Sequence, residues 1–252
     1  MEVELWQLAL LTATGALAGI INVMAGGGSL MSVPMMLFLG VPGPVANGTN
    51  RISIIAQNIV AVRTFFRRGF SDLRLSLSLA AAATPGAILG ALVGVRLDGV
   101  WFDRVLAVVM IGVLILMQLP TKKRSGESLP LTRERLILGH VLMFLAGCWG
   151  GFIQIGVGFI LMPILHRVMG LDLVRTNMHK VFIALSYNII AVAIFASAVS
   201  IHWQFGLALA LGNSIGGYLG ARFSVQGGEV WIRRVFTLVL VIFIAKLLLP
   251  LG

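Results

Sequence analysis

The sequence predicts an all-α integral membrane protein, and three observations lead to that fold class. Of the 252 residues, 58% are hydrophobic and only 11% are charged. In soluble globular domains, roughly 45–50% of residues are apolar and about 25% are charged. The mean hydropathy is +1.00. The 30 glycines are typical of membrane helices, because small residues let helix backbones approach closely. This composition argues against a disordered, coiled-coil, disulfide-stabilised or nucleic-acid-binding protein.

Eight apolar runs have about the 20 residues that a membrane-spanning helix needs. In chain order they are 5–24, 46–66, 75–95, 101–119, 136–155, 178–200, 203–221 and 232–249. The first run could be mistaken for a signal peptide, but the residues before it include Glu2 and Glu4 and no Lys or Arg. We therefore expect a retained first helix.

Two further apolar runs, 29–40 and 158–169, are too short to span a bilayer comfortably. Each follows a glycine cluster and contains a proline, Pro34 in the first and Pro163 in the second. These features predict a half-length or broken helix in each half of the chain.

The chain contains an internal repeat. At an offset of 129–130 residues, glycines, tryptophans, arginines and prolines of the first half match the same residue types in the second half. The matched pairs include Gly86 with Gly216, Gly90 with Gly220, Trp101 with Trp231, Arg104 with Arg234 and Pro34 with Pro163. We predict a first membrane repeat over 1–119, a basic cytoplasmic linker over 120–135 and a second membrane repeat over 136–252. Each repeat then holds four long spans and one short helix.

We attribute the net charge of +10 to basic residues that set the membrane topology, rather than to nucleic-acid binding. Basic residues cluster at 63–74, 120–135, 166–180 and 222–234, and cytoplasmic loops carry such an excess. The pattern favours an inverted second repeat, which requires both short segments to cross and gives ten segments. Re-entrant short segments with parallel repeats and eight spans remain the alternative.

Several classes of site are missing from the sequence. There is no Walker A motif and no His-Glu-x-x-His motif, and all nine acidic residues lie at or near the ends of apolar runs. Intramembrane carboxylates are the usual relays for protons and cations. We therefore expect neither an enzyme nor a cation transporter, and no cofactor or metal ion.

Two cations lie inside apolar runs at matching places in the two halves, Arg51 and Lys180. A cation in hydrocarbon costs about 3 kcal/mol on insertion scales, so such a residue indicates function by default. The alternative is snorkelling, in which the side chain reaches the headgroups from one turn inside.

The glycine clusters predict anion contacts, because helix N-termini present unpaired N–H groups and a partial positive charge. The residues concerned are Gly26, Gly27, Gly28 and Ser29 in the first half and Gly156 and Gly158 in the second. Close helix packing is the alternative explanation. Five polar neighbours of the two cations complete the predicted substrate-binding set: Thr49, Asn50, Asn58, His179 and Asn188.

These residues resemble the sulfite exporter TauE/SafE family of membrane permeases. The resemblance rests on Gly26-Gly27-Gly28-Ser29, Pro34, Gly40 and Thr49-Asn50-Arg51, and in the second half on Gly150-Gly151-Phe152, Gly156, Gly158 and Pro163-Ile164-Leu165. The second half departs from the pattern at Val157 and His179. The family implies export of sulfite or small organosulfur anions across the cytoplasmic membrane.

The residues and the resemblance together predict a permease of the cytoplasmic (inner) membrane that exports a small anion, with sulfite or an organosulfonate favoured. Alternating access between the two repeats is the expected mechanism. An anion channel and an importer of a sulfur-containing or carboxylate anion remain alternatives. The expected partners are the anionic substrate and the lipid bilayer, with a homodimer left open and no nucleic acid.

Overall fold

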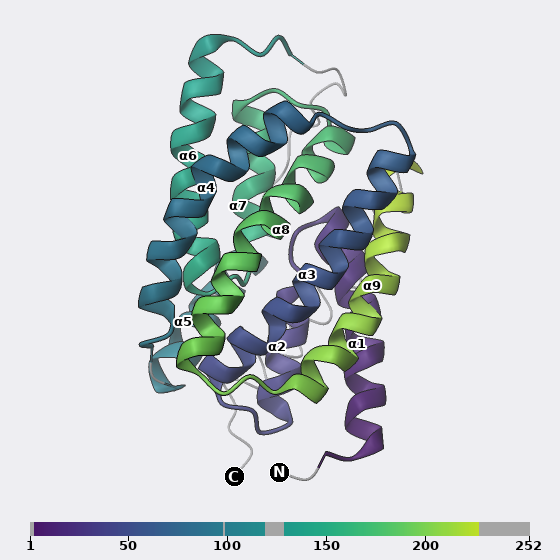
Figure 1. Ribbon diagram of the computed structural model, residues 1–252, viewed down its shortest axis with the longest axis vertical. Helices are drawn as coiled ribbons and strands as arrows, with labels where there is room; N and C mark the ends of the chain where they lie inside the picture. Colours follow the sequence, from purple (N-terminus) through teal and green to yellow (C-terminus); the bar gives the residue numbers. More distant parts are fainter. Residues whose placement is uncertain (1–2, 98, 119–128, 227–252) are drawn as a thin grey trace.

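The computed structural model describes residues 3–97, 99–118 and 129–226, and every regular element in these ranges is helical (Figure 1). The elements are α1 (Leu5–Met24), α2 (Ser29–Phe38), α3 (Gly43–Arg67), α4 (Leu73–Gly94), α5 (Gly99–Gln118), α6 (Arg133–Phe152), α7 (Val157–Pro163), the π-helical turn η1 (Ile164–Val168), α8 (Leu173–Ala198) and α9 (Trp203–Gln226). The last predicted apolar run, 232–249, lies outside the described residues, as does most of the predicted linker.

Three helices begin at side-chain caps that lie before the predicted apolar runs. The side chains of Asp72, Thr132 and Asp172 accept hydrogen bonds from backbone N–H groups near the starts of α4, α6 and α8, respectively. Such caps satisfy N–H groups that have no partner within the helix. Hence α6 begins at Arg133 and α8 at Leu173, earlier than the predicted 136 and 178, and α6 includes the last residues of the predicted linker.

The two short helices form where the glycine clusters and prolines predict them. Gly26 and Gly156 adopt left-handed backbone conformations, with φ of +87° and +73°, which glycine adopts without steric cost. α2 has 10 residues, and α7 has 7 before the chain continues at Pro163 into η1. At 1.5 Å per residue, α2 is about 15 Å long, about half the thickness of the hydrocarbon core. The predicted half-length helix is therefore confirmed for α2.

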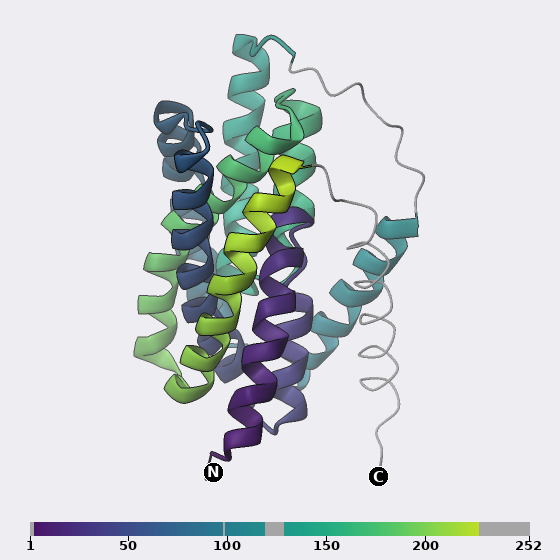
Figure 2. The same ribbon diagram turned by 90° about the vertical axis from the view of Figure 1, so that its right-hand side faces the viewer.

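Helix pairs come from opposite halves of the chain. α1 packs against α9, α6 packs against α4, and α3 and α8 lie side by side at the centre. In Figure 1, α1 and α3 run upward while α6 and α8 run downward, and α2 and α7 lead from the middle toward opposite ends. Figure 2 shows α5 tilted on the far side of the bundle from α4.

Glycines make the α1–α9 and α4–α6 contacts possible. A Cβ added at Gly90 would lie 1.9 Å from the carbonyl oxygen of Cys148 in α6, and one added at Gly216 would lie 2.1 Å from that of Ala16 in α1. The backbones of these helix pairs therefore touch directly. The repeated glycines around 86–90 and 216–220 therefore form helix-packing faces.

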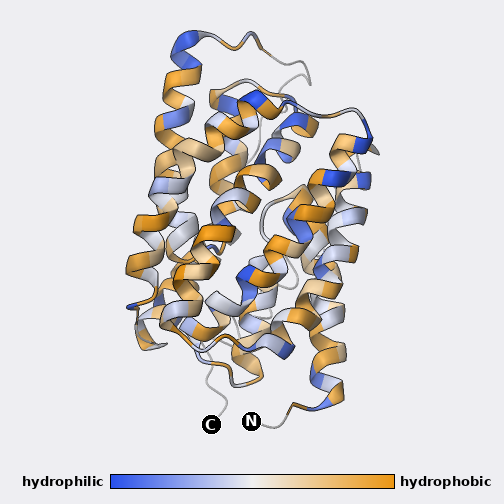
Figure 3. Cartoon of the chain, viewed as in Figure 1, coloured by the Kyte–Doolittle hydropathy of each residue, from blue (hydrophilic) through white to orange (hydrophobic). Residues whose placement is uncertain are grey.

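The surface of the bundle fits a bilayer. Four helices in the described ranges are long and apolar enough to cross one, α1, α4, α6 and α8. Leucines, isoleucines and valines along their flanks are exposed, and Figure 3 shows apolar residues covering the sides of the bundle. Hydrophilic residues gather at its upper end, where α3 meets α4 and where α6 and α8 begin. The chain is therefore a helical membrane protein.

Candidate functional site

The glycine turns that precede α2 and α7 meet inside the bundle. A Cβ placed on Gly158 would lie 2.1 Å from the Cα of Gly26, and a Cβ on Gly28 would lie 2.2 Å from the carbonyl oxygen of Ala18. Backbone therefore touches backbone at this crossing. Gly27, between Gly26 and Gly28, is also buried. Close packing thus explains the glycines at 26, 28 and 158, and it brings the starts of the two short helices side by side.

Arg51 is fully buried about two turns inside α3. Its Nη1 donates hydrogen bonds to the carbonyl oxygen of Gly150 at 3.0 Å and to Asn188 Oδ1 at 3.1 Å, and its Nη2 donates to the carbonyl oxygen of Gly151. The guanidinium carbon lies 4.3 Å from the centroid of the Phe195 ring. The buried Nε has no hydrogen-bond partner. Snorkelling, the alternative reading from sequence, is therefore excluded for Arg51.

Lys180 is buried about two turns inside α8, with 3% of its surface exposed. Its Nζ donates to the carbonyl oxygen of Val23 at 2.7 Å and to Asn177 Oδ1 at 2.9 Å. The side chain thus points into the protein, and the snorkelling alternative fails here as well.

The two cations share one kind of partner. Gly150 and Gly151 lie in the last turn of α6, and Val23 lies in the last turn of α1. Carbonyl groups in the last turn of a helix lack partners within that helix and carry a partial negative charge, which a cation stabilises. Arg51 of α3 therefore caps α6, and Lys180 of α8 caps α1.

The polar residues before Arg51 hold α2 against α3. Asn50 Oδ1 accepts a hydrogen bond from Ser32 Oγ at 2.6 Å, and Asn50 Nδ2 donates to Ser29 Oγ at 3.1 Å. Thr49 Oγ1 accepts from the backbone N–H of His202 at 3.0 Å. Ser29, Thr49 and Asn50 thus form their hydrogen bonds within the protein. These bonds hold α2 against α3, and they hold α3 against the residues that precede α9.

His179 directly precedes Lys180. It contacts α4, whereas Asn50 contacts α2. It is 1% exposed, and its Nδ1 lies 2.8 Å from Ser76 Oγ in α4. This contact joins α8 to α4, whereas the Asn50 contacts join α3 to α2 within the first half.

Two buried asparagines lie two turns beyond the cations and differ in their partners. Asn188 accepts from Arg51 and donates through Nδ2 to the carbonyl oxygen of Ala184 at 2.8 Å. Asn58 accepts from Gln57 at 3.1 Å, and its buried Nδ2 has no partner. Asn188 thus belongs to the Arg51 cluster, and Asn58 keeps a free donor.

Charge is one-sided in this interior. Among the described residues, Arg51 and Lys180 are buried and no Asp or Glu is. The same part of the chain contains no group of three or more His, Cys, Asp or Glu able to hold a metal ion. The candidate site thus contains two buried cations, one in α3 and one in α8, which donate hydrogen bonds to helix carbonyls and amide oxygens.

Sequence reasoning missed several members of this site. Phe195 lies seven residues after Asn188 and so on the same face of α8, a spacing that could have identified it. Ser32 could have been found from its place one turn after Ser29. The sequence gives no signal for the carbonyls of Gly150, Gly151 and Val23, because every residue has a backbone carbonyl.

Comparisons with known proteins agree with the geometry. Residues 11–247 match the family model described as Sulfite exporter TauE/SafE. The chain is 26% identical to a probable membrane transporter protein of Haemophilus influenzae, over 100% of this chain and 98% of that protein. It is also 26% identical to the probable membrane transporter protein ORF9 of Sinorhizobium, over 96% and 92%, and to the probable membrane transporter protein YfcA of Escherichia coli, over 96% and 89%.

No solved structure matches the chain. The family model covers nearly the whole sequence, including both buried cations and both glycine turns, and the relatives match along almost their entire lengths. The chain therefore belongs to the sulfite exporter TauE/SafE family of membrane transporters.

Proposed function

We propose that this protein exports a small sulfur-containing anion, sulfite or an organosulfonate, across the cytoplasmic membrane. The observation that carries the proposal is the pair of buried cations, Arg51 and Lys180, in an interior where no described acidic residue is buried. A buried charge is costly unless it is paired, and the partial charges of helix ends neutralise only part of two full charges. Such an interior favours an anion over any cation.

The proposed architecture is two repeats, 1–119 and 136–252, with inverted topology, joined by the linker 120–135. The packing is reciprocal: the first helix of each half contacts a late helix of the other, α1 with α9 and α6 with α4. The opposite directions of α1 and α6, and of α3 and α8, support inversion (Figure 1). The arginine-rich upper end would then face the cytoplasm.

The caps suggest how an anion could drive alternating access. Each cation joins the two halves, because Arg51 of α3 binds the end of α6 and Lys180 of α8 binds the end of α1. An entering anion carries a full charge, whereas a helix end carries about half a charge. The anion would first bind the unpartnered Nε of Arg51. It would then compete with the carbonyls for the other donors. Loss of the caps would free the halves to rock around the bound anion.

The membrane potential sets the direction of transport. With the cytoplasm negative, moving one negative charge outward gains about 2.3 kcal/mol per 100 mV. Export by this route needs no carboxylate relay, which agrees with the absence of buried acids among the described residues.

Efflux from liposomes tests the proposal. Vesicles containing the full chain are loaded with labelled sulfite, and initial efflux is compared for wild type, Arg51→Gln, Lys180→Gln and the control Arg68→Gln, which removes an exposed arginine from the end of α3. Each buried variant loses charge-assisted hydrogen bonds, so efflux should fall roughly 10- to 100-fold, while the control retains it. Wild-type rates in both buried variants would contradict the site.

The same vesicles separate the alternatives. Thiosulfate, sulfoacetate, taurine and acetate are tested as competitors to define the substrate. Saturation and counterflow identify a carrier, whereas flux that rises linearly with concentration identifies a channel. Uptake against an imposed inside-negative potential would indicate an importer.

A further inference from the structure

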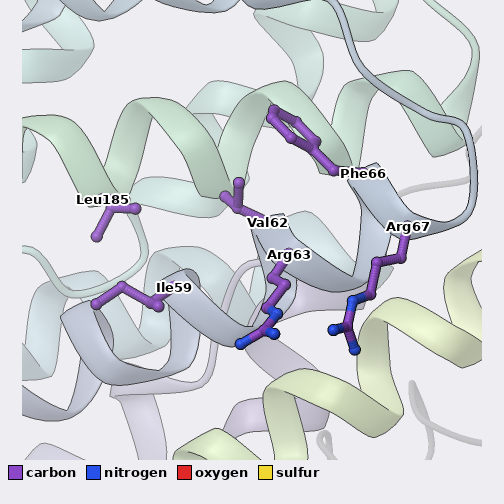
Figure 4. A pocket seen from close by; sticks show the side chains of 6 residues that line it. All are labelled: Ile59, Val62, Arg63, Phe66, Arg67 and Leu185. Carbon is purple, nitrogen blue, oxygen red and sulfur yellow. The ribbon is translucent and has the colours of Figure 1, made fainter.

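A groove of about 550 Å³ opens on the surface of the bundle between α3 and α8, away from the buried cations. Ile59, Val62, Arg63, Phe66 and Arg67 of α3 and Leu185 of α8 line it (Figure 4). Its volume lies within the roughly 300–1,000 Å³ of small-molecule sites.

The walls of the groove are apolar. Ile59 is 52% exposed, and Phe66 packs against Phe182 of α8 with ring centroids 6.5 Å apart. Ile59, Val62 and Phe66 follow one another at the spacing of one helix face. The groove is therefore a slot that suits a hydrocarbon chain.

One edge of the groove is cationic. Arg63 and Arg67 lie one turn apart, about 6 Å along α3, and Figure 4 shows both guanidinium groups extending to the same side, away from Phe66. Both residues are exposed, and in the described ranges the one salt bridge joins Arg175 to Asp172. Both arginines are thus available to a ligand.

We propose that this groove binds one anionic phospholipid, with its phosphate on Arg63 and Arg67 and an acyl chain along Ile59, Val62 and Leu185. Guanidinium groups match phosphate oxygens in bidentate geometry, and basic pockets between membrane helices bind anionic headgroups. The arginines lie near the end of α3, where we expect the headgroups, and Ile59 lies one turn farther from that end.

Charge disfavours a second copy of the chain as the occupant. A two-fold interface places the same patch of each subunit against its partner, which would bring four arginines together. A lipid instead neutralises them. It would also join α3 to α8, the helices that carry Arg51 and Lys180.

The test is lipid binding to the purified full-length protein, by native mass spectrometry and by thermal shift. The probes are phosphatidylglycerol, phosphatidylcholine with the same acyl chains, and inorganic phosphate. The variants are Arg63→Gln/Arg67→Gln, Leu185→Trp, which fills the groove without changing charge, and the control Arg68→Gln/Arg74→Gln, which removes two exposed arginines that do not line it.

Phosphatidylglycerol should bind wild type at least ten-fold more tightly than phosphatidylcholine. Loss of both groove arginines should weaken this binding roughly 30-fold, the factor expected for two juxtamembrane cations, and Leu185→Trp should weaken it while the control does not. Equal binding of the two lipids, equal loss in the control, unchanged binding in Leu185→Trp, or full competition by inorganic phosphate would each overturn the proposal. So would crosslinking of two chains through Leu185→Cys.

Discussion

The surroundings of Arg51 and Lys180 differ although the two cations occupy matching places in the sequence. Arg51 bonds two carbonyls and an asparagine, and it lies over the Phe195 ring. Lys180 donates to the carbonyl oxygen of Val23 and to Asn177 Oδ1. Both are buried caps of helix ends, but the planar guanidinium spans several acceptors, whereas an ammonium acts as a point charge.

The residues directly before the two cations also differ in the helix that they contact. Asn50, before Arg51, binds Ser29 and Ser32 of α2 in its own half. His179, before Lys180, binds Ser76 of α4 in the other half. Asn50 thus ties α3 to the short helix of its own half, whereas His179 ties α8 to a helix of the opposite half. This difference teaches that a common cap can be built into unequal surroundings, so substitutions should not act equally on the two sides.

The largest effect should come from the crossing that both regions share. Gly158→Ala would place a Cβ 2.1 Å from the Cα of Gly26, and backbone cannot move aside as a side chain can. We expect destabilisation of about 3 kcal/mol or more, at the upper end of overpacking effects, measured as loss of folded protein and a lower Tm in detergent.

Gly112→Ala in α5 is the matched control, because a Cβ there meets nothing within 4 Å. Alanine is the better helix former, so the Tm of this control should stay the same or rise. A Gly158→Ala protein with wild-type Tm would show that the crossing is looser than described.

Exchanging the cations should separate the two regions. Arg51→Lys keeps the charge, but one Nζ replaces the two nitrogens that reach Gly150 O, Gly151 O and Asn188 Oδ1, so we expect at least one of these acceptors to lose its donor. Each buried group left unsatisfied costs about 1–3 kcal/mol. Lys180→Arg keeps a donor for the carbonyl oxygen of Val23 and for Asn177 Oδ1, so its loss of hydrogen bonding should be smaller. Chemical denaturation and sulfite efflux of the two variants measure the difference, and equal losses would refute the proposed asymmetry.

The smallest effect concerns Phe195, whose ring centroid lies 4.3 Å from the guanidinium carbon of Arg51. In a double-mutant cycle, Phe195→Leu and Arg51→Gln should couple by about 0.5–2 kcal/mol, the range of cation–π contacts. The cycle of Phe195→Leu with Lys180→Gln should give coupling close to zero. Similar coupling in both cycles would mean that Phe195 acts through general packing.

Much of the fold could be predicted from local sequence. The long helices follow from apolar runs of bilayer length, and the short α2 follows from glycines and a proline close together. Helix starts were less predictable, since Asp72, Thr132 and Asp172 extend α4, α6 and α8 into polar sequence. Hydropathy alone does not detect the polar residue that caps the start of a helix.

The candidate site was predictable only in part. Arg51 and Lys180 stood out because a cation in an apolar run is rare, and Asn188 stood out by its spacing from Lys180. The glycines at 26 and 158 were expected to contact an anion, which stays a prediction, and the structure shows that they also pack against each other at the crossing. Close packing was the alternative explanation from sequence, and the opposing backbone that it requires is visible only in the tertiary structure.

The sequence by itself determined that the chain folds as membrane helices, where short helices interrupt them, and that two cations lie within the apolar segments. These properties depend on composition and spacing within about twenty residues. Only the tertiary structure decided what the cations bind. Arg51 reaches carbonyls 99 and 100 residues away, and Lys180 reaches one 157 residues away. Such partners are set by how helices from opposite halves pack, because a backbone carbonyl becomes an acceptor for a distant cation only where a helix end is brought beside it.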